Sequence, residues 1–306
     1  MRLSTAISGG LLLAACLLAT GASAQTGGSE GLSPTLSAIK NRHTVRLGYR
    51  ESSPPFSFLD QSGRPIGYSL ELCEAIVEEI GVEVDDPDLK IDYVKVTSDD
   101  RIDAVLQNKI DLECGSTTAN AERGKRVAFS PLMFVAGTKL MVPKASKVQS
   151  LTDLKGKTIV VTKGTTNEQA IHAADKKSSL GLNIVTSPDH EQSYQMLVDG
   201  KADAFATDDI LLSGLIARHK AQDKFRVTGD YLSYDPYGIM FRKGEPQLTA
   251  VVDRTFRKLG SNQDLIPLYN KWFIARLPTG ERLNVPISLQ LEEAFKSMDD
   301  SASANN

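Results

Sequence analysis

Residues 157–177, KTIVVTKGTTNEQAIHAADKK, contain the pattern that decides the fold. The β-branched, apolar run 157–162 predicts a strand, and 167–177 predict a helix. The glycine and threonines between them are typical of a turn that leads into a helix. A strand followed directly by a helix is the repeating unit of a parallel α/β sheet.

The same unit recurs along most of the chain, at intervals typical of doubly wound sheets. Upstream, strands are expected at 45–49, 91–96 and 110–114, and helices at 69–81, 98–109 and 119–128. Downstream, strands are expected at 182–186 and 202–207, with a helix at 191–200. In the helix 69–81, Ser69 is the expected cap and Gly81 the expected end, and Ser98 is expected to cap the next helix.

The tail after Asp235-Pro236 contains two further expected helices, 246–259 and 263–273. If the tail returns to the first half, two lobes result, joined by crossings near 135–142 and 233–238. The expected organisation is a signal peptide (1–24), a flexible leader (25–36), the first part of lobe 1 (37–137), lobe 2 (138–236) and the return of lobe 1 (237–306).

The N-terminus has the features of an export signal. An early arginine and an apolar run precede Ala22-Ser23-Ala24, a small-x-small cleavage site, so we expect cleavage after Ala24. The alternative is lipidation of Cys16 in the sequence LAAC, although the apolar run continues past this cysteine. No later apolar run approaches the roughly 18 residues that span a bilayer, so we expect a soluble protein of the periplasm.

Charge excludes one class of partner. The chain has 38 acidic and 35 basic residues and no basic block, so nucleic acid is not expected to bind. Cys73 and Cys114 remain after cleavage, and an oxidising compartment favours their pairing. The alternative is two separate buried thiols.

The sequence contains none of the enzyme or metal-binding motifs considered below. LKGKT at 154–158 resembles the end of a phosphate-binding loop, but the required earlier glycine would fall at Leu151. The histidines His43, His172, His190 and His219 lack metal-ligand spacing, and GxSxG and GxGxxG do not occur. Neither a metal nor a cofactor is expected.

Doubly wound sheets bind ligands beyond the carboxyl ends of their strands. Arginine offers a planar donor fork that matches a carboxylate, hydroxyls donate to the same oxygens, and an aspartate accepts from an ammonium. An anion site that faces a cation site fits an amino acid. The candidates are Arg50, Ser98, Ser116, Thr118, Arg123, Thr165, Thr166, His190 and Asp208.

Each candidate also has a simpler interpretation. An arginine is more often a solvated or ion-paired surface residue, and Ser98 or Asn120 is suited to capping a helix. The pair Thr165-Thr166 fits a turn, and His190 fits an ordinary loop. The joint position of these residues at strand ends favours a site.

Seven stretches resemble the periplasmic solute-binding proteins of polar amino-acid ABC transporters, closest to the glutamate/aspartate-binding members. They are YRESSPPFSF (49–58), TSDDRI (97–102), ECGSTTANAER (113–123), TKGTTNE (162–168), PDHEQSY (188–194), TDD (207–209) and DPYG (235–238). The resemblance covers nearly the whole mature chain, in family order. It implies a Venus-flytrap fold of type II character: two doubly wound lobes, a two-strand hinge and a ligand in the cleft.

The resemblance also implies roles. The α-carboxylate is expected at Arg123, helped by Ser116, Thr118 and either Thr165 or Thr166, and the α-ammonium at Asp208. The side-chain carboxylate is expected within a cationic cluster of Arg50, Ser98, Arg101 and His190. Lys163 departs from the family, in which a small residue precedes GTT. Cys114 is expected at a strand end, facing the helix that carries Cys73, so that a disulfide joins helix and sheet.

The expected function is a non-catalytic receptor for L-glutamate and L-aspartate that closes on its ligand and delivers it, as a monomer, to an inner-membrane permease. One alternative is a cyclohexadienyl or arogenate dehydratase on the same fold, for which the basic cleft offers little acid beyond Asp208. Another is a sensor partner of a chemoreceptor or kinase, with an identical site.

Overall fold

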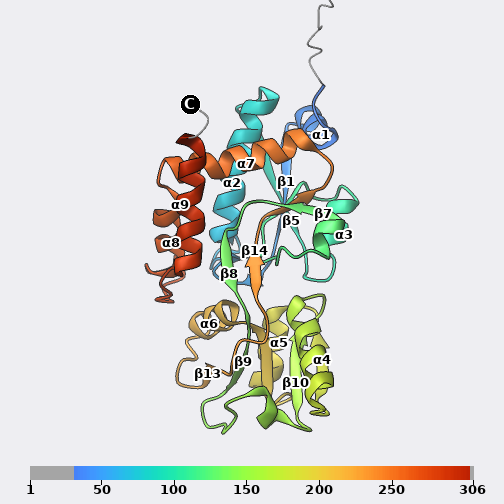
Figure 1. Cartoon of the computed structure of the whole chain (residues 1–306), viewed down its shortest axis with the longest axis vertical. Helices are drawn as coiled ribbons and strands as arrows, with labels where there is room; N and C mark the ends of the chain where they lie inside the picture. Colours follow the sequence, from blue (N-terminus) through green and yellow to red (C-terminus); the bar gives the residue numbers. More distant parts are fainter. Residues whose placement is uncertain (1–30, 304–306) are drawn as a thin grey trace, which may run out of the picture. The chain divides into compact units, whose positions relative to one another are not determined.

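The computed structural model describes residues 31–303 of the 306-residue chain. The expected signal peptide, 1–24, and the alternative lipidation site at Cys16 lie outside the described residues. The described chain forms two lobes, each built on a five-stranded mixed sheet with helices packed around it (Figure 1). The predicted two-lobed α/β architecture is confirmed.

The sheet of the first lobe has the strand order β5-β1-β6-β15-β7. Strands β1, β5 and β6 are parallel, whereas β15 is antiparallel to its neighbours β6 and β7. Because β15 returns from the second lobe, it enters at the end where the parallel strands finish. The strands are β1 (Thr44–Tyr49), β5 (Lys90–Lys95), β6 (Leu112–Glu113), β7 (Val127–Phe129) and β15 (Met240–Arg242).

The sheet of the second lobe has the order β11-β10-β12-β9-β13. Here β10, β11 and β12 are parallel, and β9, which arrives from the first lobe, is antiparallel to β12 and β13. The sequence pattern predicted parallel sheets and did not reveal these antiparallel strands. The strands are β9 (Thr138–Pro143), β10 (Thr158–Thr162), β11 (Asn183–Ser187), β12 (Ala204–Asp208) and β13 (Phe225–Thr228).

Two segments connect the lobes and pair with each other. β8 (Phe134–Ala136) leads into β9, and β14 (Asp235–Tyr237) leads back toward β15, with Pro236 opposite Val135. A small sheet follows β1 and consists of β2 (Ser52–Ser53), β3 (Ser57–Leu59) and β4 (Pro65–Ile66).

Helices pack around both sheets (Figure 1). Among the described residues, none of them is both long and apolar enough to cross a membrane. Helix α1 begins at Pro34, so the end of the expected leader 25–36 is helical. The helices are α1 (Pro34–Arg42), α2 (Tyr68–Val84), α3 (Arg101–Leu106), α4 (Thr166–Ser178), α5 (His190–Val198), α6 (Asp209–Arg218), α7 (Pro246–Ser261), α8 (Leu265–Phe273) and α9 (Leu289–Ser303), with 3-10 helices η1 (Arg123–Lys125) and η2 (Leu151–Leu154).

The ends of α2 differ from the prediction. Ser69 lies inside the helix, and its hydroxyl donates to the Gly115 carbonyl at 2.8 Å instead of capping the first turn. Gly81 also lies inside, and the helix ends at Val84, with Asp85 as its C-cap in a left-handed conformation with φ 57°. Helix α2 therefore extends beyond the residues that the local signals predicted.

The expected helix 119–128 is reduced to η1. The Ala119 N–H donates to the Pro236 carbonyl at 2.7 Å, and Thr118 forms a β-bridge with Tyr237. These contacts with the returning segment hold the chain extended where a helix would otherwise begin.

The hydrophobic core of the first lobe includes two residues of the second. Ile210 and Leu211, in the first turn of α6, are buried in the same apolar cluster as Phe56 and Tyr237. The start of α6 is thus packed directly against the first lobe.

Candidate functional site

A small cavity lies where polar strand ends of the two lobes meet. Apart from Leu211, every residue that lines it is polar or charged. All but Asn167 and Leu211 belong to the residues selected from the sequence. The lining consists of Ser98, Arg101, Ser116 and Thr118 from the first lobe and Thr165, Thr166, Asn167, His190, Asp208 and Leu211 from the second.

Arg50 follows β1, and its side chain is buried, with 1% exposure. Its backbone N–H donates to Ser57 Oγ at 2.8 Å. Nη1 and Nη2 have no hydrogen-bond partner among the described residues. Burial, and then repulsion from Arg101, lower the pKa of Arg50 to about 10, so it stays charged at neutral pH. Arg50 therefore offers two free, charge-assisted donors to an anion.

Arg101, in the first turn of α3, is buried and held by hydrogen bonds. Its Nη1 donates to Thr117 Oγ1 at 2.6 Å and to the Ser116 carbonyl at 3.4 Å. The Thr117 hydroxyl in turn donates to Glu113 Oε2 at 2.6 Å. Arg101 Nε is buried without a partner in the described chain.

Arg123, at the start of η1, bridges the two lobes. Nη1 donates to the Thr118 carbonyl at 2.9 Å and Nη2 to the Gly164 carbonyl at 3.4 Å. Burial, and then the charge of Arg101, lower the pKa of Arg123 to about 9, while Glu113 and other acidic groups oppose this. The guanidinium is charged at neutral pH.

Asp208, at the end of β12, is a buried carboxyl. It accepts from Asn167 Nδ2 at 2.8 Å and from the Tyr237 hydroxyl. Burial, and then the nearby Asp235, raise its pKa to about 7. A cation placed beside Asp208 would stabilise the ionised form.

Asp235 connects hydroxyls of both lobes. Its Oδ1 accepts from Thr118 Oγ1 at 3.0 Å and from Thr166 Oγ1 at 2.8 Å, and the two threonines lie 3.1 Å apart. The Ser233 hydroxyl donates to its other oxygen. Asp235 thus ties the returning segment to both sides of the cavity.

His190 is the first residue of α5 and is 1% exposed. Its Nδ1 lies 2.7 Å from Thr162 Oγ1. Burial, then Arg50 and Arg101, lower its pKa well below 6.5, so the imidazole is neutral at pH 7. Within the expected cluster of Arg50, Ser98, Arg101 and His190, the neutral imidazole therefore offers hydrogen bonding rather than positive charge.

The hydroxyls of the site fall into two groups. Those of Ser98 and Ser116 are buried and have no partner among the described residues, as expected of groups that contact a ligand. Ser98 does not cap α3, whose cap position is Asp100. In contrast, the Thr165 hydroxyl donates to the Thr162 carbonyl at 2.7 Å and caps α4. The backbone N–H of Thr165 is therefore more available to a ligand than its hydroxyl.

Sequence reasoning missed five residues of this region, namely Glu113, Thr117, Asn167, Leu211 and Asp235. Thr117 lies between two residues that were selected, and Asp235 lies in the DPYG motif. Thr117 contacts Arg101 across 16 residues, and Asp235 contacts Thr118 and Thr166 across 117 and 69 residues, so no local pattern identified them.

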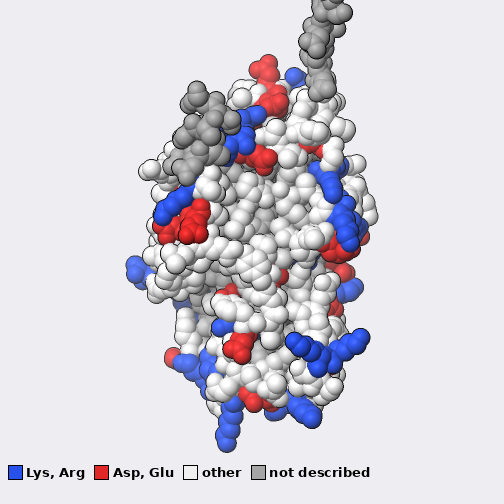
Figure 2. Space-filling model, in the orientation of Figure 1, with Lys and Arg blue, Asp and Glu red and all other residues white. Residues whose placement is uncertain are grey.

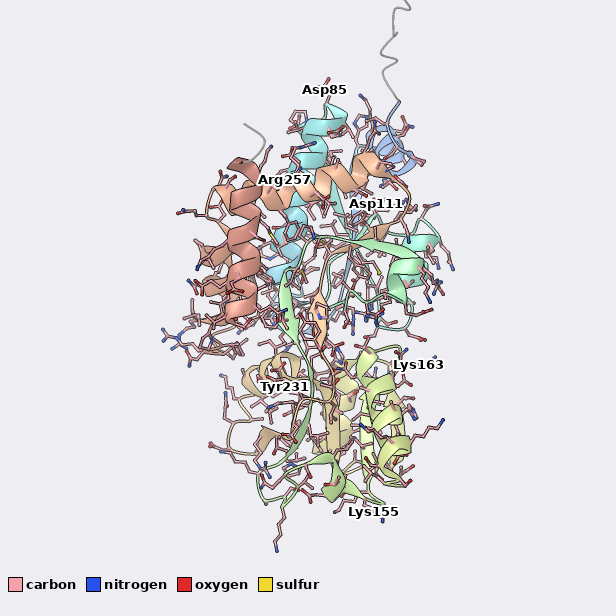
Figure 3. The ribbon with its side chains drawn as sticks, in the orientation of Figure 1. Asp85, Asp111, Lys155, Lys163, Tyr231 and Arg257 are labelled. Atoms are coloured by element: carbon pink, nitrogen blue, oxygen red, sulfur yellow. A yellow bond between two sulfur atoms is a disulfide. The ribbon has the colours of Figure 1, made fainter. Side chains whose placement is uncertain are left out.

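Lys163 lies at the boundary between the lobes (Figure 3). Its Nζ is 2.9 Å from Asp99 Oδ2, and more than half of its side chain is exposed. The charge is therefore paired across the lobes at the surface and does not face the cavity.

Cys73 of α2 and Cys114 after β6 form a disulfide, with Cα atoms 6.2 Å apart. The prediction of this pair is confirmed. Because Cys114 is part of this disulfide, it is not a free nucleophile.

The arrangement combines three buried guanidiniums with unpartnered hydroxyls and one carboxyl of raised pKa. It is suited to holding carboxylates beside an ammonium. On the face drawn in Figure 2, basic and acidic side chains of the described residues are interspersed.

Comparison with known proteins gives consistent matches. At 40% identity, 276 residues match the L-glutamate/L-aspartate-binding protein of Pseudomonas aeruginosa, covering 90% of this chain and 91% of that protein. The glutamate/aspartate import solute-binding protein of Salmonella typhimurium is 36% identical over 276 residues, with coverage of 90% and 91%. Among solved structures, a mutant of ArgBP from T. maritima superposes with a TM-score of 0.70 at 28% identity, covering 78% of this chain and 98% of that one.

The family model of the bacterial extracellular solute-binding proteins, family 3, matches residues 45–275. Apart from Thr44 of β1, this span contains both sheets, and it contains every residue that lines the cavity. The chain belongs to the bacterial extracellular solute-binding proteins, family 3.

Proposed function

We propose that this protein is the periplasmic receptor of an ABC importer for L-glutamate and L-aspartate. The observation that carries the proposal is Arg50, whose two buried terminal nitrogens lack partners in the described chain and interact electrostatically with Arg101 and His190. A buried, unpaired guanidinium is costly, and a ligand carboxylate would satisfy it.

The proposed ligand contacts form three groups. The side-chain carboxylate binds at Arg50, Ser98, Arg101 and His190. The α-carboxylate binds at Arg123, Ser116 and Thr118, with Thr165 and Thr166 of the second lobe. The α-ammonium binds at Asp208, whose raised pKa favours a cation partner.

Binding is coupled to lobe closure. Residues 138–236 are proposed to move against 37–137 and 237–306, with the ligand stabilising the closed state because it contacts both lobes. A micromolar dissociation constant corresponds to about 8 kcal/mol, which two carboxylates held by arginines and hydroxyls supply after desolvation costs. The closed monomer then docks on the inner-membrane permease.

Relatives of this chain are named as binding proteins rather than as enzymes, and the dehydratase alternative has less support. The N-terminal proposal is separate: residues 1–24 direct export and are removed by cleavage after Ala24. Sequencing of the exported protein would give Gln25 as its first residue, whereas a lipidated Cys16 at the N-terminus would replace this proposal.

Thermal-shift and calorimetric screening of the twenty amino acids tests the ligand. We expect L-glutamate and L-aspartate to raise Tm most and to give saturable heats. Absence of binding by both, together with binding of another solute, would overturn the assignment.

A further inference from the structure

We propose that Glu113 and Thr117 position Arg101 and thereby set the preference for a ligand with a side-chain carboxylate, an inference that rests on the proposed function. Neither residue lines the cavity, and both are fully buried. They act through the guanidinium that does line it.

The connection is a chain of two short hydrogen bonds. Glu113 Oε2 accepts from the Thr117 hydroxyl at 2.6 Å, and the oxygen of that hydroxyl accepts from Arg101 Nη1 at 2.6 Å. The direction of donation is fixed, because a guanidinium only donates and a carboxylate only accepts. Of these three residues, Thr117 is thus the one that both donates and accepts a hydrogen bond.

These hydrogen bonds leave the rest of the Arg101 guanidinium available to a ligand. Arg101 Nη1 is occupied by Thr117 and by the Ser116 carbonyl, whereas the buried Nε has no partner among the described residues. An arginine has several rotatable bonds, and holding one nitrogen restricts the orientation of the whole planar group. The remaining donors are therefore directed before a ligand arrives.

Glu113 also reduces repulsion among the arginines. Arg101 lowers the pKa of both Arg50 and Arg123, and Glu113 raises both. One buried carboxylate therefore stabilises the charged forms of the arginines that are proposed to hold the two ligand carboxylates.

Gly115 provides the space for this carboxylate. A Cβ added to Gly115 would lie 2.4 Å from Glu113 Oε1 and 3.0 Å from Arg50 Cγ. A side chain at this position would therefore clash with the Glu113 carboxylate and crowd the Arg50 side chain.

A double-mutant cycle tests the inference, with Thr117→Val, Arg101→Ala and the double variant titrated with L-glutamate. Loss of a hydrogen bond to a charged group predicts that Thr117→Val raises Kd roughly tenfold. In the Arg101→Ala background, the same substitution is expected to change Kd little, because its effect passes through Arg101. Thr117→Ser, which keeps the hydroxyl, is expected to restore most of the affinity.

Binding of L-glutamine, which lacks the side-chain carboxylate, is expected to weaken less than binding of L-glutamate. Thr255→Val is the matched control, because Thr255 is a buried threonine of the same lobe whose hydroxyl donates to the Val251 carbonyl in α7. It is expected to alter Tm without altering Kd.

Equal losses in both backgrounds, or equal losses for both ligands, would show that Thr117 has a merely structural role and would overturn the inference. Failure of the unsubstituted protein to bind L-glutamate would instead refute the proposed function.

Discussion

Lys163 Nζ lies 2.9 Å from Asp99 Oδ2, and this ion pair joins the turn after β10 to the turn after β5, across the two lobes. The backbones also meet here, since a Cβ added to Gly164 would lie 2.6 Å from Asp99 Cα. The ion pair is therefore a surface contact between the two lobes.

Lys163→Ala is expected to weaken L-glutamate binding only a few-fold, and only at low salt, because both side chains are largely exposed and screened. Calorimetry at two salt concentrations measures this effect. Lys157→Ala is the control, since Lys157 pairs with Asp203 inside the second lobe. Equal effects of the two variants would contradict a role in closure.

Gly214→Ala is expected to weaken ligand binding without lowering the stability of the second lobe. Gly214 lies inside α6, where alanine is favoured by about 1 kcal/mol, so unfolding of the second lobe is not expected to become easier. An added Cβ, however, would lie 2.3 Å from the Pro54 carbonyl oxygen of the first lobe. Closure should therefore be hindered, and Kd should rise by at least about tenfold.

Thermal denaturation and calorimetry measure the two effects of Gly214→Ala. Gly124→Ala is the control, because a Cβ at that position meets no atom within 4 Å. Unchanged affinity in Gly214→Ala would show that the contact with Pro54 can relax at no cost.

Arg50→Met is expected to raise the Kd for L-glutamate roughly 100-fold, because one partner of a buried charge pair is removed. The loss for L-glutamine should be smaller. Arg254→Met removes an arginine that is paired with Glu79 and Glu83 in the first lobe, and it should lower Tm without changing Kd. Retained selectivity in Arg50→Met would remove Arg50 from the site.

Asp208 predicts a pH dependence of both folding and binding. Its pKa is raised from 3.8 to about 7 in the folded protein, so its protonated form is favoured there. The stability contributed by this group is fully present below about pH 4 and is lost as pH rises through about 7. An ammonium bound beside Asp208 favours the ionised form, so binding should release a proton.

We expect the affinity for L-glutamate to increase from pH 5 to pH 7 and then to level off, with about half a proton released at pH 7. Calorimetry in buffers of different ionisation enthalpy measures the proton count. Asp208→Asn should abolish the release and weaken binding. A binding heat that is independent of the buffer at pH 7 would argue against an ammonium at Asp208.

Reduction of the Cys73–Cys114 disulfide is expected to lower Tm. The two residues are 41 positions apart, and closing a loop of that length stabilises by roughly 4 kcal/mol in the chain-entropy model. Cys73→Ala/Cys114→Ala should show the same loss without reducing agent. Detection of two thiols in unreduced exported protein would contradict the bond.

The strand-end rule identified most of the cavity lining because it depends on local signals. Ser98, Ser116, Thr165 and Asp208 each follow a run of residues with a clear strand pattern, and parallel strands place such residues at one edge. The lobes could be predicted for the same reason, because each is built from consecutive strand and helix units.

The supporting groups could not be predicted in this way. Glu113 lies within a strand and gains its role from Thr117 and Arg101, while the hydroxyls that Asp235 bridges lie more than 60 residues away. The neutral state of His190 likewise depends on burial and on two arginines distant in the chain. Such properties arise from tertiary packing, which no local pattern contains.

The position of β15 has a consequence for the order in which the protein folds. This strand lies between β6 and β7 and is the partner that joins β7 to the sheet, yet it follows all five strands of the second lobe in the chain. When the polypeptide is synthesised from the N-terminus, all five strands of the second sheet can pair before β15, the fourth strand in the order of the first sheet, is available. Residues so distant in sequence pair slowly, and an unpaired β6 edge invites aggregation. The lobe that is synthesised first is therefore completed last.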